Sequence, residues 1–473
     1  MTESSAHPKA KWLLLFLTFA LASPAALGQM PQGSGPGIGQ QQTPEAQHRA
    51  AAAGARSSTE MVGAGTLMNP SISVIMDGVY ANEFSGHVDD PGGFEMGHDH
   101  GHGHGHDHGF KDGFQLRETE FAFEATVDPY FDAFAMLVIE GTDHVDLEEA
   151  YFTTRSLPWG LQIKGGRFLS DIGYINSFHP HDWDFVDRPL ASEHIFGDHG
   201  LQETGLQLNW VAPTTSYLKL GLESLQGEGG SFARHEGDYA DSAGPRLTTA
   251  FAKWGPDLGF DHAAQFGASF GYNRAWHDEE EHTTDREIWD GDAWFAGLDA
   301  VYKYTPPRSY QGEGQLTIQG EWFYRHIDTD YLVYSHSKDN SDYPFGDGVG
   351  AAGNIDESTS WKQDGMYLQA VYGIAPRWRA GVRAEALGLL DNQTHVHRSR
   401  HADLTDDAGY ADLDTSYRYS ASVTHYPTEF SYIRGQVNYS DFASGSPDGS
   451  SEDSWQFLVQ YNLSLGVHGA HPF

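Results

Sequence analysis

Residues 455–467 read WQFLVQYNLSLGV. Every second residue, beginning with Trp455, is aromatic or aliphatic, while most positions between them are polar, as at Gln456, Gln460, Asn462 and Ser464. A period of two places alternate side chains on opposite faces of an extended strand. The segment therefore predicts a β-strand with one apolar face and one polar face.

The same contrast recurs along the chain from Ile72 onward, for example where Leu206, Leu208 and Trp210 alternate with Gln207 and Asn209. About sixteen segments of this kind are predicted: 71–84, 114–127, 130–141, 144–156, 159–168, 201–212, 216–226, 245–255, 260–275, 292–305, 313–328, 362–375, 377–391, 413–427, 428–440 and 454–467. Alternation alone also fits a soluble β-sandwich.

The connections between the segments separate these two folds. Short turns, most of them containing proline, as at Pro129, Pro158, Pro213 and Pro376, alternate with longer connections, except for one near Thr142. The longer connections run from about 13 to 33 residues, and short turns on one side with long loops on the other are typical of bacterial transmembrane barrels. The predicted fold is therefore all-β: a transmembrane antiparallel β-barrel of about 16 strands, with long outer loops and short periplasmic turns.

Aromatic residues fall beside the predicted short turns, namely Trp159, Trp210, Trp254, Tyr304, Trp378 and Tyr426. Such a row predicts a girdle at one membrane interface and outer-membrane lipid as a partner. The aromatic terminus Phe473 is similar to the assembly signal that the barrel-assembly machinery reads. The polar inner face predicts a lumen wide enough for water.

Charge and composition narrow the function. The 473 residues include 66 acidic and 28 basic side chains, so the formal net charge is −38. Nucleic acid is therefore excluded as an expected partner. The chain has no cysteine, which removes thiolate metal sites and cysteine nucleophiles, whereas its 26 histidines are an unusual number.

The N-terminal residues predict targeting. Lys9 and Lys11 precede an apolar run, and Ala26 and Gly28 fit a cleavage site before Gln29. We expect a signal peptide at 1–28, a flexible periplasmic leader at 29–69 and the barrel at 70–473. This predicts the outer membrane of a Gram-negative bacterium, with both termini in the periplasm.

A histidine-rich segment is the main chemical signal. Six histidines alternate with glycine or aspartate, and neutral imidazole suits Zn²⁺, Ni²⁺ or Cu²⁺. The predicted metal ligands are His87, His98, Asp99, His100, His102, His104, His106, Asp107 and His108. No cofactor is required, and the metal would be a ligand or substrate. The alternative is a solvated outer loop with no assigned task.

A second group of charged residues lies in one long outer connection, which in many sixteen-stranded porins folds into the barrel. The predicted pore constriction comprises His179, His181, Asp182, Asp184, Asp187, Arg188, Glu193, His194 and His199. Charged rings in a constriction set ion selectivity. In the alternative interpretation, Asp187 pairs with Arg188 to brace the loop while Trp183 and Phe185 pack on the wall.

Three weaker sequence signals indicate neither a binding site nor a catalytic site. The acidic run 277–282 and the trio His395, His397 and His401 fit solvated loops. Residues 267–271 match the GxSxG pattern, but they lie inside a predicted strand where the required turn cannot form. The chain is therefore not expected to be an enzyme.

Three strings also carry a family resemblance: HPHDWDFVDRPL at 179–190, NPSISVI at 69–75 and HGAHPF at 468–473. They resemble the bacterial zinc-regulated outer-membrane receptor family, whose members are often labelled TonB-dependent. That label implies a plug domain and energy coupling. Only about forty residues separate the predicted signal from the first strand, so we expect a porin-like barrel without a plug.

The leading functional prediction is a cation-preferring outer-membrane channel that assists uptake or capture of zinc or a similar divalent metal. Two alternatives stay open: a general diffusion porin whose histidine-rich loop is incidental, and a surface metal-binding barrel with little conductance. Single-channel recording separates the last from the other two. Whether the barrel forms a homotrimer is also open.

Overall fold

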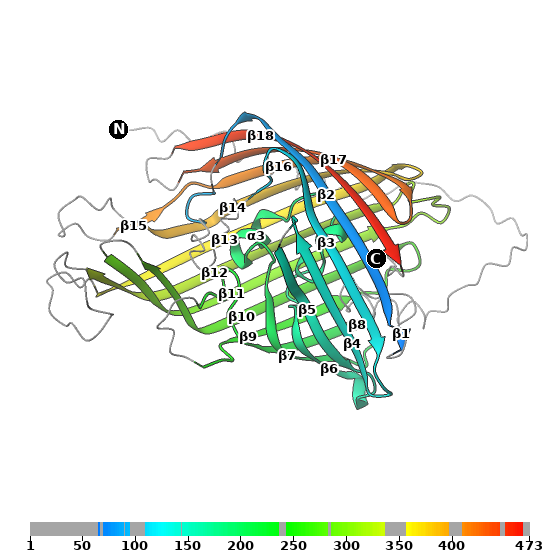
Figure 1. The fold of residues 1–473 in the computed structure, drawn as a ribbon, viewed down its shortest axis with the longest axis horizontal. Helices are drawn as coiled ribbons and strands as arrows, with labels where there is room; N and C mark the ends of the chain where they lie inside the picture. Colours follow the sequence, from blue (N-terminus) through cyan, green and yellow to red (C-terminus); the bar gives the residue numbers. More distant parts are fainter. Residues whose placement is uncertain are drawn as a thin grey trace, which may run out of the picture. The chain divides into compact units, whose positions relative to one another are not determined.

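Sixteen antiparallel strands pair in chain order and close into a ring (Figure 1). The computed structural model describes residues 65–66, 70–88, 90–94, 109–142, 144–235, 243–281, 285–335, 356–396, 409–444 and 450–466. The first strand of the ring, β2, pairs with the last, β18, so neither edge is left unpaired. Closure of this kind satisfies every backbone polar group in lipid, and the predicted fold is confirmed.

The ring strands are β2 (Ser71–Gly86), β3 (Gly113–Thr126), β4 (Phe131–Glu140), β5 (His144–Thr154), β6 (Leu161–Leu169), β7 (Gln202–Val211), β8 (Tyr217–Leu225), β9 (Leu247–Gly255), β10 (His262–Glu281), β11 (Asp285–Tyr304), β12 (Leu316–Ser335), β13 (Asp356–Ala375), β14 (Trp378–Val396), β16 (Ser416–Thr428), β17 (Ser431–Ala443) and β18 (Ser451–Gly466). Two short strands join them: β1 (Gly65–Thr66) runs parallel to β3, and β15 (Gly409–Asp412) pairs with β14.

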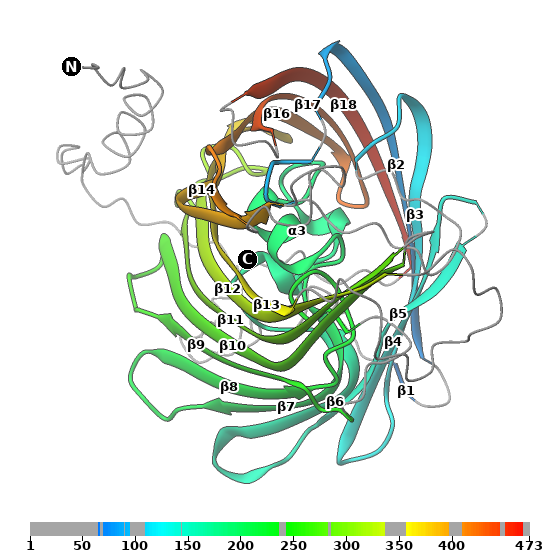
Figure 2. The ribbon, with the colours of Figure 1, turned by 90° about the vertical axis from the view of Figure 1, so that its left-hand side faces the viewer.

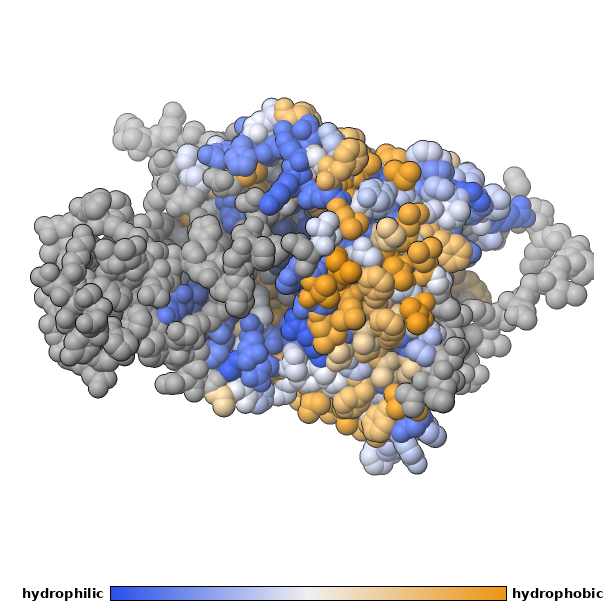
Figure 3. Space-filling view, viewed as in Figure 1, coloured by the Kyte–Doolittle hydropathy of each residue, from blue (hydrophilic) through white to orange (hydrophobic). Residues whose placement is uncertain are grey.

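The predicted alternation is confirmed by which side chains are exposed. On β7, Leu206 and Leu208 are exposed while Gln207 and Asn209 are buried, and β18 shows the same contrast at its apolar and polar positions. Polar residues inside and apolar residues outside reverse the arrangement of a soluble protein. Figure 3 shows apolar side chains gathered over the middle of the face that it presents.

Tryptophans confirm the predicted girdle at the end of the barrel that carries the short turns. Trp159, Trp210, Trp254 and Trp378 are all exposed there. The indole N–H of Trp210 donates to the Trp159 carbonyl oxygen at 3.0 Å, and that of Trp254 donates to the Ser216 hydroxyl at 3.0 Å. These contacts keep the ring apolar toward lipid and satisfy its one donor, as an interfacial tryptophan requires.

Several strands are longer than the sequence predicted, and the strict alternation of connections is wrong at two places. Strands β10 and β11 are joined by residues 282–284 alone, so most of the acidic run 277–282 lies on a strand and not in a loop. Residues 305–315 between β11 and β12 form a longer connection than the predicted turn. The ladder continues past the apolar band, where both faces are polar and the period-two contrast disappears.

Four short helices complete the described residues: η1 (Pro158–Gly160), η2 (Ile175–Ser177), η3 (Pro180–Asp182) and α3 (Leu190–Phe196). No helix in this part of the chain has the length and apolar character needed to cross a membrane. The predicted signal peptide, the leader and most of the histidine-rich segment lie outside the described residues, so these predictions stay predictions.

Candidate functional site: the loop inside the barrel

The connection between β6 and β7, residues 170–201, lies inside the ring of strands, and we name it the inward loop (Figure 2). It carries η2, η3 and α3, and most of its side chains are buried. The predicted inward course of this connection is confirmed. Because the loop fills part of the lumen, its contacts with the wall decide what space remains for a solute.

Asn176 holds the two ends of the inward loop together. Its amide nitrogen donates to the carbonyl oxygens of Ser170 and Leu201 at 2.8 and 3.0 Å, and its carbonyl oxygen accepts the Leu201 N–H at 2.8 Å. Gly173 lies close to the wall at φ +57°, and a Cβ there would come within 2.2 Å of Glu321 Oε2. Only glycine fits this turn, because the position has neither the space nor the backbone conformation for a side chain.

The helix α3 packs against apolar side chains that point inward from the wall. The Phe196 ring lies 5.0 Å from that of Phe295 and 4.9 Å from that of Phe323, and both contacts are edge to face. Leu190, Ile195 and Phe196 are fully buried in this cluster. The prediction that lumen-facing positions are polar is therefore wrong here, because the apolar face of α3 needs apolar partners.

A second contact holds the loop through charge. We name it the acid–histidine cluster, formed by Glu118, Glu120, Glu148, Glu149, His179 and His181. His181 Nδ1 lies 2.8 Å from Glu120 Oε1. His179 Nε2 lies 3.1 Å from Glu149 Oε2, and its Nδ1 lies 3.4 Å from Glu148 Oε2. The two imidazole rings are parallel, with centroids 6.0 Å apart.

Two β-bulges concentrate carboxylates at this cluster. The register between β2 and β3 shifts so that Asp77 faces Glu118 and Gly78 faces Leu116, which leaves Arg117 as the extra residue. The register between β4 and β5 shifts in the same way and leaves Glu148 as the extra residue beside Glu149. A bulge turns two consecutive side chains toward one face. Neighbouring charges therefore both point into the lumen.

The carboxylates keep both histidines protonated. Burial lowers the pKa of His179, but the Glu148 and Glu149 carboxylates outweigh it and raise the pKa well above its usual value. Burial also lowers the pKa of His181, and Glu120 and Asp182 together raise it to about 9. An opposite charge within a few ångströms favours the charged form. At neutral pH the loop therefore brings two positive charges to this acidic part of the wall.

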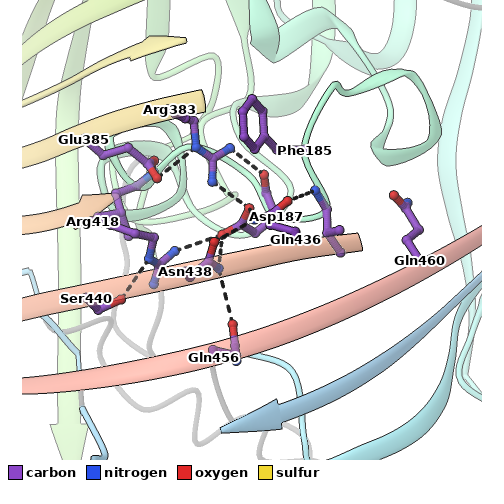
Figure 4. Close-up of polar contacts among 12 residues, drawn as sticks. Phe185, Asp187, Arg383, Glu385, Arg418, Gln436, Asn438, Ser440, Gln456 and Gln460 are labelled. Carbon is purple, nitrogen blue, oxygen red and sulfur yellow. Dashed lines mark hydrogen bonds and ion pairs between the residues drawn. The ribbon is translucent and has the colours of Figure 1, made fainter. Parts of the chain in front are cut away.

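A third contact, which we name the arginine patch, centres on Asp187 and is formed with Arg383 and Arg418 (Figure 4). Arg383 Nη2 donates to Asp187 Oδ1 at 2.6 Å, and Arg418 Nη1 donates to Oδ2 at 3.3 Å. Gln436 and Asn438 also donate to this carboxylate. These donors, above all the two arginines, overcome the effect of burial and lower the pKa of Asp187.

Arg188 is not the partner of Asp187, so the predicted bracing pair is wrong. Its guanidinium carbon lies 4.8 Å from the Trp183 ring, and its Nη1 donates to Ser192 Oγ at 3.1 Å. The wall arginines outcompete it because their forked donors reach both Asp187 oxygens. Trp183 and Phe185 are buried as predicted, and the Arg383 guanidinium lies over the Phe185 ring at 4.6 Å.

A fourth contact lies at Lys164, Lys219 and Lys253, which we name the lysine wall. Lys219 Nζ lies 2.7 Å from Asp171 Oδ2, and Gln207 donates to the same oxygen at 3.2 Å. Asp171 is at the start of the inward loop, so this contact fixes the loop where it leaves β6. The loop is thus held by charges of both signs.

Of the other predicted constriction residues, Asp182 lies beside the acid–histidine cluster and the rest lie elsewhere on the loop. Asp182 is near His181, with Oδ2 3.6 Å from Nε2, and Asp184 is partly exposed. Burial raises the pKa of Glu193 to about 7, and burial lowers the pKa of His194 to about 3. His199 is exposed and lies 3.7 Å from Glu140. The structure therefore brings only part of the predicted set together.

The predicted metal ligands are only partly described. His87 is exposed, and its Nδ1 lies 2.8 Å from Glu83 Oε2. His98, Asp99, His100, His102, His104, His106, Asp107 and His108 lie outside the described residues. Within the described residues, no three histidine, aspartate or glutamate side chains are arranged to hold a metal ion.

Sequence reasoning missed the wall residues that bind the inward loop. Their signal is an interruption of the alternation, since Arg117–Glu118 and Glu148–Glu149 place consecutive charges inside strands. A strand with a regular period would send one of each pair into lipid, at a cost of several kcal/mol for a charge near the middle of the bilayer. Paired charges inside a membrane strand therefore indicate a bulge.

A search against protein-family models finds no match. The outer membrane channel DcaP of Acinetobacter baumannii is similar in fold, with a TM-score of 0.51 and 12% identity over 86% of this chain and 100% of that chain. Pseudomonas putida OprB aligns with a TM-score of 0.47 and 9% identity over 84% and 94%. The likeness to DcaP shows the fold of an outer-membrane barrel. The resemblance to zinc-regulated receptors stays a prediction.

One protein is also similar to this chain in sequence. An uncharacterized protein of Aquifex aeolicus (strain VF5) is 34% identical over 368 residues, which cover 76% of this chain and 70% of that protein. Identity at this level over most of both chains indicates common descent. The present chain therefore belongs to the same family as that Aquifex aeolicus protein.

Proposed function

We propose that the protein is a passive channel of the bacterial outer membrane for small hydrophilic solutes, not an enzyme, with both termini in the periplasm. The observation that carries this proposal is the inward loop, which reaches the wall through charged and hydrogen-bonded contacts. A barrel that served only as a surface anchor needs no such lining. The fold shared with DcaP, which is described as an outer membrane channel, supports the same function.

Planar-bilayer recording of the full chain tests this function. We expect stepwise conductance, and we expect Asp187→Asn to change the step size because it frees the loop from Arg383 and Arg418. Asp257→Asn, in the exposed turn before β10, makes the same charge change away from the lumen and should leave the step size unchanged. The absence of conductance from folded, heat-modifiable protein would refute the channel.

We further propose that the channel prefers cations. The chain carries a formal net charge of −38, and the acid–histidine cluster with the adjoining Asp77 gathers five carboxyl groups on one part of the wall. Asp187, by contrast, is neutralised by two arginines, so it contributes less than the sequence suggested. A surplus of fixed negative charge raises the local concentration of cations.

Reversal potentials in a salt gradient measure this preference. Glu148→Gln should weaken it, more visibly at low salt where screening is less, and so should neutralising Asp182 and Asp184 to Asn. Asp257→Asn is again the matched control. Anion selectivity of the unaltered protein would refute a cation preference while leaving the channel itself intact.

The zinc function is a finer part of the same proposal. Histidines 98–108 would capture Zn²⁺ or a similar divalent metal before it enters, since neutral imidazoles bind these ions and protonated ones do not. Replacing the six histidines with serine should remove most of the zinc binding measured by calorimetry at pH 7.5, and binding to the parent should fall at pH 5.5. Binding that survives the replacement but is lost in His179→Gln would move the metal site to the inward loop.

A further inference from the structure

Three ammonium groups line one part of the lumen wall. Lys164, Lys219 and Lys253 lie on β6, β8 and β9, and each is less than a tenth exposed. Lys219 and Lys253 are direct partners in the register of β8 with β9. Like charges placed opposite each other destabilise a strand pair. Such an arrangement needs carboxylates nearby, and Asp299 and Glu321 on the wall attract Lys253.

The inward loop supplies one carboxylate to these lysines. Asp171 Oδ2 lies 2.7 Å from Lys219 Nζ and accepts a hydrogen bond from the Gln207 amide at 3.2 Å. The Asp171 N–H donates to Glu223 Oε1 at 3.2 Å, which fixes the backbone at this point. Burial alone would raise the pKa of Asp171, but Lys219, Lys164 and Lys253 together hold it below its usual range.

Two of the three ammonium groups keep unused capacity. Among the described residues, Lys253 makes no hydrogen bond or ion pair and lies 5.7 Å from the Phe251 ring centroid. Lys164 likewise contacts only rings, at 4.6 Å from Tyr151 and 4.9 Å from Phe168. An ammonium has three donors, and a buried one without an acceptor is costly. Lys253 is thus a wall ammonium that makes no direct hydrogen bond or ion pair within the described residues, although Asp171, Asp299 and Glu321 attract it.

We propose that the lysine wall is a binding site for the carboxylate group of a solute and that Asp171 occupies this site as a built-in substitute. The inference rests on the proposed channel function, independently of the cation preference, and deepens it by naming one class of solute that the lysine wall would bind, small organic acids. A solute carboxylate takes the position of the Asp171 side chain, accepts from Lys219 and Gln207, and extends toward Lys253. The loop end is released in the exchange.

The substitute sets how tightly a solute binds. A tethered carboxylate competes at an effective concentration of the order of millimolar, so a free carboxylate binds the unaltered protein weakly. When the Asp171 carboxylate is removed, the lysine wall is open to a solute in every molecule. Asp171→Asn should therefore bind a small carboxylate about tenfold more tightly than the parent does.

Calorimetry with succinate on the full chain in detergent, at constant sodium chloride, tests the proposal without relying on conductance. Asp171→Asn should lower the Kd about tenfold, and adding Lys253→Met to that variant should reverse most of the gain. Glu193→Gln is the matched control, since it removes a carboxylate from the same loop away from the lysines. It should leave the Kd unchanged.

The outcomes separate this inference from the proposed function. A Kd that is unchanged in Asp171→Asn, or lowered equally in Glu193→Gln, overturns the carboxylate site even when the channel conducts. Succinate binding that follows the expected order in a barrel without conductance supports the site and refutes the channel. If Asp171→Asn does not fold, Lys253→Met in the parent provides the test, and only a severalfold weaker succinate affinity supports the proposal.

Discussion

The inward loop meets the wall in two regions of opposite sign. At the acid–histidine cluster, the wall supplies carboxylates and the loop supplies imidazolium groups, whereas at the arginine patch and the lysine wall these roles are exchanged. In neither region does every charged group have a direct partner. Glu118 Oε1 and Glu120 Oε2 have no hydrogen-bond donor within the described residues, and Lys253 contacts the Phe251 ring there but makes no direct ion pair. The loop thus leaves charged groups without a direct partner in both regions.

The largest effect should come from breaking the arginine patch. Arg383 is buried and binds both Asp187 and Glu385, at 2.6 and 2.9 Å. Arg383→Met leaves two buried carboxylates with fewer donors, and removal of one partner of a buried pair typically costs about 3–5 kcal/mol. Thermal unfolding in detergent should show a loss of this size, together with altered conductance steps.

A double variant checks the cause of that loss. Asp187→Asn combined with Arg383→Met removes one of the two stranded charges, so it should recover part of the stability. An equal loss in the single and double variants would mean that packing of Arg383 on Phe185, and not the ion pair, holds the loop.

The acid–histidine cluster should weaken at alkaline pH. The pKa of His181 is raised to about 9, against about 6.5 in an unfolded chain. Its stabilising contribution is therefore complete below pH 6.5 and is lost as the pH rises through 9. Unfolding free energies at pH 6.5 and 9.5 should differ by about 1–3 kcal/mol more in the parent than in His181→Gln. A pH dependence that is identical in both proteins would remove His181 from the contact.

The sequence predicted the barrel far better than it predicted these contacts. Alternation at positions such as Leu206 and Gln207 reports which side chains face lipid, because lipid imposes one rule on every strand. Partners across the lumen obey no such local rule. Asp187 and Arg383 are 196 residues apart, and their pairing depends on the closed ring. The bulge at Glu148 is detectable in principle, but only as a break in an otherwise regular pattern.

A negative charge on the loop should be unfavourable where burial outweighs the attraction of the nearest wall cation, which for Glu193 is Arg418. Burial raises the pKa of Glu193 to about 7, so ionisation costs free energy that grows as pH rises from about 4.5 to 7. Glu193→Gln should therefore stabilise the protein by about 1 kcal/mol at pH 8 and change nothing at pH 4.5. Destabilisation at pH 8 would show that this carboxylate has a partner of its own.

The smallest predicted effect is the difference in stability between variants of two lysines of the lysine wall, Lys164 and Lys219. Lys219 carries an ion pair with Asp171, whereas Lys164 contacts only the Tyr151 and Phe168 rings. Replacing an unpaired buried ammonium with an apolar side chain of similar length removes a desolvation penalty along with the cation–π attraction, which is worth about 1 kcal/mol. These terms oppose each other, so Lys164→Met should change stability by less than about 1 kcal/mol. Lys219→Met should lower the free energy of unfolding by more, since it leaves Asp171 without its ion-pair partner.

Thermal unfolding of both variants in the same detergent measures this difference. Equal losses would mean that the lysine wall acts as one unit and that Asp171 is shared among all three ammonium groups.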